Sequence, residues 1–267
     1  MNPHLLILPL ELEREIFCDD GRITPQDNSY SPPGGASRSP PLLYRVIVTN
    51  SIPPDVLRRA MHVEPPSFFD ASVRHLVLIP CESLMEEAHA LLLRLCTKTF
   101  SLAIIGTCST PELLPMLRDM SEVRKWAGQL KNLFGSYDAI DLRHPFFRTI
   151  THMDVFDDGL NLRTYILPGL LAFPALTHLC LNETVPADLL RCVLEQSTRL
   201  QVLVQLWPQS QAQFAHQIAT SPPAVDVRFV VGTYTRYWDP WAIGVPAGNR
   251  LLDRSGWVHC AEAPRRD

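Results

Sequence analysis

The sequence lacks the motifs on which many known catalytic and cofactor-binding sites are built. Its 267 residues contain no Gly-x-Ser-x-Gly, no Gly-x-x-x-x-Gly-Lys, no Gly-x-Gly-x-x-Gly and no His-Glu-x-x-His. These motifs position a nucleophile, a phosphate group, a dinucleotide and a zinc ion, respectively. We therefore expect a protein that is not an enzyme and that needs no cofactor.

Paired cysteines, long apolar runs and an excess of basic charge are missing as well. The seven cysteines are odd in number and scattered, without a Cys-x-x-Cys pair, which indicates free thiols in a reducing compartment. No apolar run reaches the ~18 residues of a membrane span, and Leu5 to Leu10 runs directly into Glu11, unlike a signal peptide. The net charge is −4, which does not favour nucleic-acid binding. These features predict a protein of the cytoplasm or nucleus that binds neither membranes nor nucleic acid.

Proline, by contrast, is abundant. The chain contains 24 prolines, and 46% of its residues are apolar. A chain of this length and apolar content can bury a sizeable core, whereas frequent prolines end helices early. The composition therefore predicts a protein that is folded over most of its length and is built from many short elements.

Short strand-like runs recur from Leu42 onward. They are Val73–Leu78, Phe100–Ile105, Val123–Trp126, Ile150–Val155, Leu176–Leu181, Leu200–Val204 and Val225–Val230. Their first residues are separated by 27, 23, 27, 26, 24 and 25 positions. A period of about 25 residues resembles that of leucine-rich repeats, in which each repeat adds one parallel strand to a curved solenoid.

Helical patterns fill the intervals between these runs. Helices are predicted from the capping box Ser83–Glu86 to Leu95, from Thr110 onward, from Pro186 to Glu195, and from Gln209 to Thr220 with Phe214 and Ile218 facing inward. Pro115 must fall in the first turn of its helix or break it. Strands and helices that alternate at a fixed period predict an α/β fold with a parallel sheet backed by helices.

The resemblance to leucine-rich repeats is irregular. The family places an Asn or Cys nine positions into each repeat. The same count leads to Cys81 and Cys108 in two repeats, but to Asp158 and Thr184 in two others. The resemblance implies an irregular leucine-rich-repeat-like solenoid over residues 42–238.

The amino-terminal stretch from Leu8 to Phe17 reads LPLELEREIF. Pro9 suits the first turn of a helix, and Leu12, Ile16 and Phe17 fall on one face. Such a short helix needs a partner to cover its apolar face. The stretch resembles the opening of an F-box, the module by which substrate receptors dock on the adaptor of a cullin-type ubiquitin ligase. That resemblance implies a docking face made of Leu8, Pro9, Leu12, Ile16 and Phe17.

A second segment, Pro41 to Ile47, resembles the region that follows the F-box in a fungal family of F-box-like proteins. Between the two segments, residues 18–41 are rich in Pro, Gly and Ser and nearly free of apolar side chains. Such a segment cannot offset its ordering entropy by burial. We therefore expect a truncated F-box-like helix at 1–17, a disordered linker at 18–41, the solenoid, and a loosely ordered tail at 239–267. The aromatic residues expected to cover the last repeat's open core are Tyr234, Tyr237, Trp238 and Trp241.

Two sets of residues carry possible chemistry. His75, His152 and His178 are each third in their runs, so they are expected to point outward from the concave face, with the last two on adjacent strands about 4.8 Å apart. With Asp154 they would make a partial metal site, but no further ligands follow at fixed spacing, and surface side chains are the preferred interpretation. Asp157 and Asp158 precede a glycine, as in an ordinary turn, and nothing nearby supplies a second group for acid/base catalysis.

The first functional hypothesis is a non-enzymatic protein-interaction module, a substrate receptor of a cullin-type ligase that holds protein cargo on its concave face. Its predicted cargo contacts are Arg74, Thr151, His152, Asp154, Thr177 and His178. The alternative is a free-standing repeat scaffold without a ubiquitin link, whose amino-terminal helix caps the first repeat. A third hypothesis is a small hydrolase or metal enzyme that uses His152, His178 and Asp154, which would have to converge in a pocket.

Overall fold

The computed structural model describes residues 45–81, 86–171, 173–182, 184–235, 237 and 257–259. The chain divides into two compact units, Met1–Leu43 and Tyr44–Asp267, and all described residues belong to the second. The predicted F-box-like helix at 1–17 and the predicted linker at 18–41 therefore lie outside the described residues. The same is true of Ser83, of Trp238 and Trp241, and of most of the tail at 239–267.

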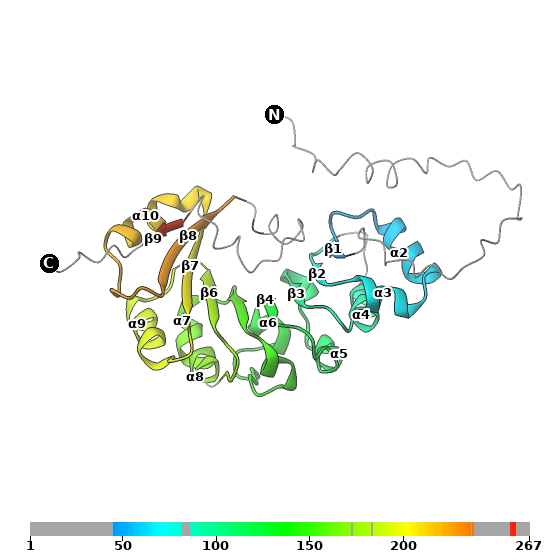
Figure 1. Cartoon of the computed structure of the whole chain (residues 1–267), viewed down its shortest axis with the longest axis horizontal. Coiled ribbons are helices and arrows are strands. Elements are labelled where there is room, and N and C mark those ends of the chain that lie inside the picture. Colours follow the sequence, from blue (N-terminus) through cyan, green and yellow to red (C-terminus); the bar gives the residue numbers. More distant parts are fainter. Residues whose placement is uncertain are drawn as a thin grey trace, which may run out of the picture. The chain divides into compact units, whose positions relative to one another are not determined.

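A single sheet of nine strands runs through the second unit (Figure 1), and its strands follow one another in the order of the sequence. The first eight pair in parallel. They are β1 (Val46–Val48), β2 (His75–Leu78), β3 (Ser101–Ile104), β4 (Lys125–Gly128), β5 (His152–Val155), β6 (His178–Asn182), β7 (Val202–Pro208) and β8 (Phe229–Tyr234). The predicted parallel sheet backed by helices is thus confirmed, as a solenoid-like α/β fold.

The ninth strand was not predicted. β9 (Trp257–His259) lies within the region expected to be a loosely ordered tail. It pairs antiparallel with β8, so that Val231 is opposite Val258. The free edge of the last parallel strand is therefore covered by main-chain hydrogen bonds, as an exposed sheet edge requires.

Helical segments connect the parallel strands and lie on one side of the sheet. The α-helices are α2 (Pro54–Val63), α3 (Pro66–Ser72), α4 (Glu86–Leu95), α5 (Leu114–Leu117), α6 (Leu130–Phe134), α7 (Gly159–Asn161), α8 (Leu167–Leu170), α9 (Ala187–Gln196) and α10 (Ala212–Thr220). Shorter 3-10 turns are η2 (Gly106–Cys108), η3 (Pro111–Leu113), η4 (Pro145–Thr149) and η6 (Gln209–Gln211), and η5 (Leu162–Ile166) is a π-helix. Figure 1 shows α4, α5, α6, α8 and α9 along the outer side of the curved sheet.

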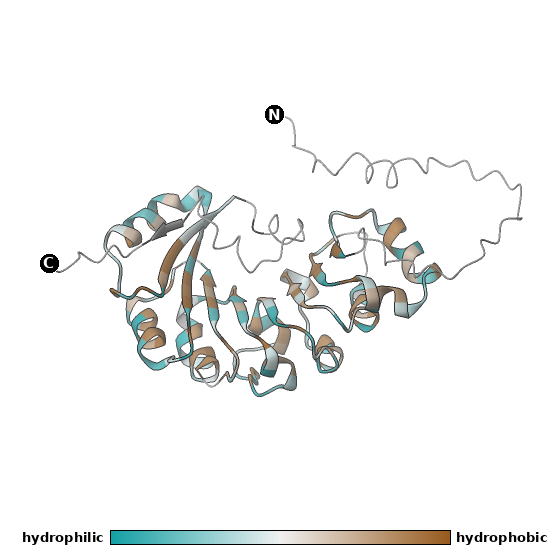
Figure 2. Ribbon diagram, viewed as in Figure 1, coloured by the Kyte–Doolittle hydropathy of each residue, from teal (hydrophilic) through white to brown (hydrophobic). Residues whose placement is uncertain are grey.

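The core lies between the sheet and these helices. Alternate strand residues such as Leu76, Leu102, Met153 and Leu179 are almost fully buried there. Figure 2 shows the corresponding apolar stripes on the strands and on the inner helix faces. The helices cover their apolar faces against the sheet, which explains why a 24- to 29-residue unit can repeat without its own separate core.

Two details differ from the sequence prediction, and one agrees with it. Val225 is 86% exposed, and the predicted run Val225–Val230 contributes only its end to β8. The cause is a turn in which the Asp226 carboxylate accepts hydrogen bonds from the backbone and guanidinium N–H groups of Arg228. In α10, Phe214 is 44% exposed instead of facing inward. Pro115 occupies the first turn of α5, directly after η3, as predicted.

Candidate binding surface

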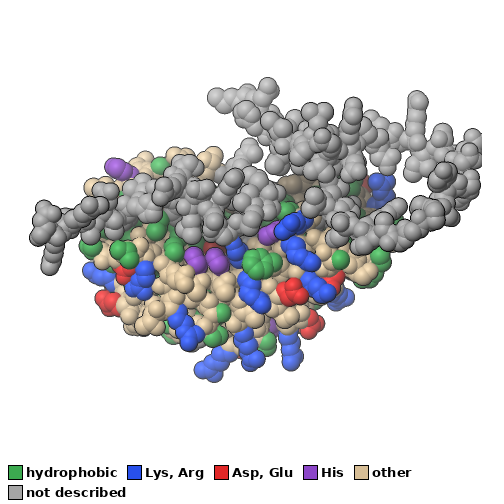
Figure 3. All heavy atoms as spheres, viewed as in Figure 1, with side chains coloured by type: hydrophobic (Ala, Val, Ile, Leu, Met, Phe, Trp, Pro, Cys, Tyr) green, Lys and Arg blue, Asp and Glu red, His purple; other side chains and the backbone are tan. Residues whose placement is uncertain are grey.

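One row of side chains crosses seven strands on the face of the sheet that the helices leave uncovered. The strand register aligns Val46, His75, Ser101, Lys125, His152, His178 and Val202. Successive strand residues point to opposite faces, and the alternate residues of these strands belong to the core under the helices. We call the five polar members of this line, from His75 to His178, the histidine row. Figure 3 shows histidine side chains together with lysine and arginine side chains on one side of the molecule.

His152 and His178 form the most ordered part of the row. Their rings stack with centroids 4.1 Å apart and planes inclined by 6°. Each ring Nδ1 lies 2.8 Å from the hydroxyl of the preceding threonine, Thr151 or Thr177. Each hydroxyl donates its single hydrogen to a main-chain carbonyl of the previous strand, that of Arg124 or Thr151, at 3.1 Å. The hydroxyl must then accept from the ring, so that Nδ1 carries the proton and Nε2 keeps its lone pair.

The surroundings of the row keep its histidines neutral. Burial, then the neighbouring His178 and Lys125, lowers the pKa of His152 to about 3. Burial and Lys125 also lower the pKa of His178. At the other end, burial, then Arg45, Lys125 and Arg74, lowers the pKa of His75 to about 4. The row therefore presents two parallel neutral Nε2 acceptors beside one amine.

Ser101 and Lys125 are the members of the row that the sequence analysis missed, and Lys125 is the charged one. It is the third residue of the run that begins at Val123, the same position that singled out His75, His152 and His178. The position in the repeat therefore points to Lys125 as well, although lysine is not among the usual metal-ligating side chains. Lys125 is 8% exposed. Burial lowers its pKa, and the carboxylate of Asp154 opposes that shift.

Asp154 lies two residues beyond His152 on the same face of the sheet. It contacts an aromatic residue from the segment that follows β8. Its Oδ2 accepts a hydrogen bond from the hydroxyl of Tyr237. Burial raises the pKa of Asp154 to about 6, although the Tyr237 hydrogen bond and Lys125 act in the opposite direction. Tyr237 also packs against Phe156, with ring centroids 4.9 Å apart. Tyr237 thus packs across β5 to β8, in one buried cluster with Cys180, Val204 and Leu206. Its predicted role as a cover on the last repeat's core stays a prediction.

The other predicted cargo contacts lie directly before the first residue of a strand: Arg74 before β2, Thr151 before β5 and Thr177 before β6. The guanidinium of Arg74 donates to the carbonyl oxygens of Asp70 at 3.0 Å and Val73 at 3.1 Å. Thr151 and Thr177 tie neighbouring strands together through the carbonyl bonds described above. The structure therefore brings His152, His178, Thr151 and Thr177 into one array, but it turns Arg74 toward the main chain. Contact of these side chains with cargo stays a prediction.

The carboxylate pair after β5 has separate structural partners. The Asp157 carboxylate accepts the backbone N–H of Leu130 at 2.6 Å and of Lys131 at 2.9 Å, which satisfies the amino end of α6. The Asp158 carboxylate accepts from Asn161 at 2.9 Å. Asp158 thus lies in a turn, as the sequence predicted, whereas the role of Asp157 as a helix cap was not predicted.

A polar cavity of about 630 Å³ lies at the carboxyl ends of the central strands. Its lining includes Lys131, Tyr137, Asp158 and Asn182. Asn182 donates from Nδ2 to the carbonyl of Val155 at 3.2 Å, and its buried Oδ1 has no partner among the described residues. Ligand sites of open α/β sheets occur at this edge, so the cavity extends the candidate surface beyond the histidine row.

The predicted metal alternative lacks its ligands in the described part of the chain. His152 and His178 do lie together, but the described residues contain no group of three or more His, Cys, Asp or Glu side chains that would hold a metal ion. Face-to-face rings also direct their Nε2 lone pairs side by side instead of toward one point. Within the described ranges, no helix has the length and apolar content needed to cross a membrane.

Comparison with known proteins adds no relative. No protein-family model, no curated protein and no solved structure matches the chain.

Proposed function

We propose that the protein is a non-enzymatic interaction module, an irregular leucine-rich-repeat-like receptor that holds protein cargo on the sheet face carrying the histidine row. In this proposal its amino-terminal segment docks on the adaptor of a cullin-type ubiquitin ligase. The receptor does no chemistry; it raises the effective concentration of cargo beside a ubiquitin-charged enzyme. The step from fold to function is made by analogy.

One observation supports the receptor part most directly. Five polar side chains from five successive strands stand in one line, with neighbours in register from His75 to His178. The spacing between neighbours follows the distance between strands, about 4.8 Å. His75, Ser101 and Lys125 are at most 8% exposed, whereas His152 and His178 are partly exposed. A partner segment that crosses the strands would therefore meet the row first at these two rings.

The ligase part is supported by residues 8–17 and their resemblance to an F-box opening. It is tested by a pull-down of the adaptor subunit with the full-length protein and with a Leu12→Asp, Ile16→Asp variant. A Glu11→Gln, Glu13→Gln variant, altered on the opposite helix face, serves as the matched control. We expect binding by the wild type and the control, and none by the Asp variant, because charges on the apolar face must be desolvated on docking.

Failure of all three proteins to bind the adaptor would favour the alternative, a free-standing repeat scaffold. The two functions also differ in the state of Leu12, Ile16 and Phe17. A docking helix leaves them accessible until the adaptor binds, whereas a cap of the first repeat packs them permanently. Hydrogen exchange of residues 8–17, with and without the adaptor, separates these states.

A further inference from the structure

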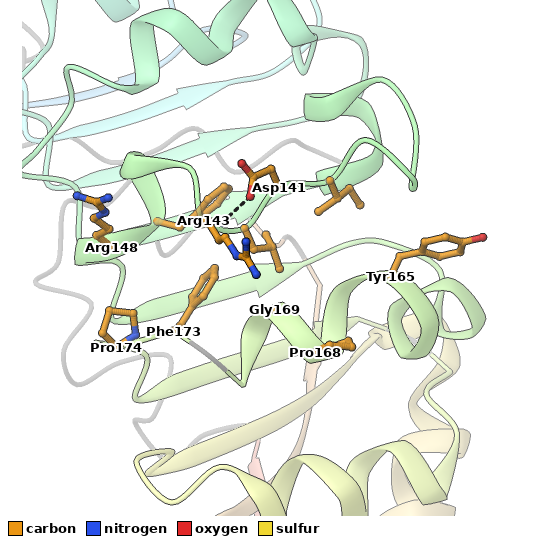
Figure 4. Close-up of a pocket in the computed structure, with 11 residues that line it drawn as sticks. Asp141, Arg143, Arg148, Tyr165, Pro168, Gly169, Phe173 and Pro174 are labelled. Carbon is orange, nitrogen blue, oxygen red and sulfur yellow. Dashed lines mark hydrogen bonds between the residues drawn. The ribbon is translucent and has the colours of Figure 1, made fainter.

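A second cavity, of about 690 Å³, opens on the helix-covered side of the sheet, away from the histidine row. It lies between the segment that leads into β5 and the segment that leads into β6. Its lining runs through Ile140–Arg143 and Phe147–Arg148 on one side and through Tyr165, Pro168–Gly169 and Phe173–Pro174 on the other. In the view of Figure 4, Arg148 and Pro174 stand at one end, Tyr165 and Pro168 at the other, and Arg143 between them. We call it the outer hollow.

The floor and walls of the outer hollow are largely aromatic. Phe147 and Phe173 are almost fully buried and stack with centroids 5.6 Å apart. Tyr165, 39% exposed, stacks on Tyr137 at 5.6 Å and forms a wall. Phe147 and Phe173 hold the floor in place, and Tyr165 supplies the accessible ring, which costs little entropy to use in binding because it is already stacked.

Two basic side chains border this apolar surface. Arg143 and Arg148 are exposed. Neither guanidinium group has a hydrogen bond or ion pair to the part of the chain that the structure describes. Nearby, Arg163 pairs with Asp188 and Arg199 donates to the carbonyl of Pro174. Among the described residues, the hollow therefore holds two arginines without a charge partner, opposed by the carboxylate of Asp141, which accepts the Arg143 backbone N–H.

We propose that the outer hollow binds a segment of a partner protein that carries carboxylate side chains on both sides of an aromatic or large aliphatic side chain. The apolar side chain packs against the exposed ring of Tyr165, over the floor that Phe147 and Phe173 form, and the carboxylates pair with Arg143 and Arg148. Arginine suits this task because its planar group binds a carboxylate in a bidentate manner while lying against an aromatic ring. The inference does not depend on the ligase assignment.

The test measures fluorescence anisotropy of a labelled peptide, Glu-Glu-Phe-Glu-Glu-Leu, titrated with the full-length protein. Two further peptides separate charge from apolar contact: Lys-Lys-Phe-Lys-Lys-Leu and Glu-Glu-Ser-Glu-Glu-Ser. The test variant is Arg143→Gln with Arg148→Gln, and the matched control is Arg59→Gln with Arg94→Gln, two exposed arginines on α2 and α4. Circular dichroism checks that all variants are folded.

We expect the acidic aromatic peptide to bind the wild type and the control equally. The Arg143, Arg148 variant should raise its Kd at least about tenfold, because each lost charge pair weakens binding. Tyr165→Ser should raise it about threefold without changing the salt dependence, since it removes only apolar contact. The proposal is overturned if the acidic aromatic peptide does not bind, if the Lys or Ser peptide binds as tightly, or if the Arg143, Arg148 variant binds like the wild type.

Discussion

The imidazole rings of His152 and His178 lie parallel, 4.1 Å apart, and each donates from Nδ1 to the threonine hydroxyl that precedes it. This relationship predicts a single tautomer for both rings. NMR correlation of the ring nitrogens with the ring carbon-bound protons should show Nδ1 protonated and Nε2 unprotonated at pH 7. In a Thr177→Val variant, which removes one acceptor but keeps the side-chain shape, His178 alone should become a mixture of tautomers. An unchanged His178 would contradict the assigned hydrogen-bond direction.

The same pair predicts sensitivity to acid. The pKa of His152 is about 3 in the folded protein and about 6.5 in an unfolded chain, so the unfolded state binds more protons between these values. Stability is therefore fully present above pH 6.5 and falls as the pH decreases toward 3. We expect the urea midpoint to fall less between pH 7 and pH 4.5 in His152→Gln than in the wild type. His216→Gln, on the exposed face of α10, should behave as the wild type does.

Tyr237→Phe is predicted to weaken the contact between the segment that follows β8 and strand β5. The change removes the hydroxyl that donates to the buried Asp154 carboxylate, and an unpaired buried acceptor costs about 1–3 kcal/mol. The pKa of Asp154 is raised to about 6, so this carboxyl contributes stability at low pH that is lost as the pH rises through 6. The loss in the variant should therefore be larger at pH 8 than at pH 5. Tyr165→Phe, whose ring is half-exposed, is the control, and equal losses at both pH values would contradict the prediction.

Asp157→Ala is predicted to destabilise the protein by about 1–2 kcal/mol through loss of the helix cap. The carboxylate accepts two backbone N–H groups of α6 from the adjacent repeat, and alanine leaves both without a partner. Asp158→Ala, at an exposed turn residue, should cost about 0.5 kcal/mol or less. Urea unfolding at pH 7 measures both values. Equal effects would mean that the cap contributes nothing specific.

The sequence was sufficient for the strand period and for much of the face assignment. Alternation within short apolar runs, combined with a near-constant spacing, placed His75, His152 and His178 on one face, and the register aligns them as expected. Strand boundaries were less predictable. The run at Val225 looked like a strand because its apolar residues alternate, but the Asp226–Arg228 ion pair forms a turn there.

The missed contacts connect residues far apart in the chain. Tyr237 binds a residue 83 positions earlier, and Asp157 caps a helix 27 positions earlier. Sequence patterns report local periodicity, whereas these contacts depend on how neighbouring repeats stack. The outer hollow has the same origin, since its two sides belong to different repeats and only their packing brings Phe147 next to Phe173.

A last prediction concerns a place where one repeat departs from its neighbours. β3 and β5 place large side chains, Ile104 and Val155, at the position that Gly128 occupies in β4. A Cβ atom at residue 128 would lie 2.8 Å from the indole Cζ2 of Trp126 and 2.7 Å from the carbonyl oxygen of Ile104. The indole of Trp126 therefore occupies the space that a side chain at residue 128 would need, and glycine leaves that space open.

Gly128→Ala should accordingly destabilise the protein by about 1–3 kcal/mol, because the buried indole and the neighbouring strand must both shift. Trp126→Leu alone should cost about 3 kcal/mol by leaving a cavity. In the double variant the added methyl group no longer meets the indole, so the combined loss should be smaller than the sum by about 1 kcal/mol. Urea unfolding of the three variants completes the cycle. Strict additivity would show that the contact with the Ile104 carbonyl, and not the indole, requires glycine at this position.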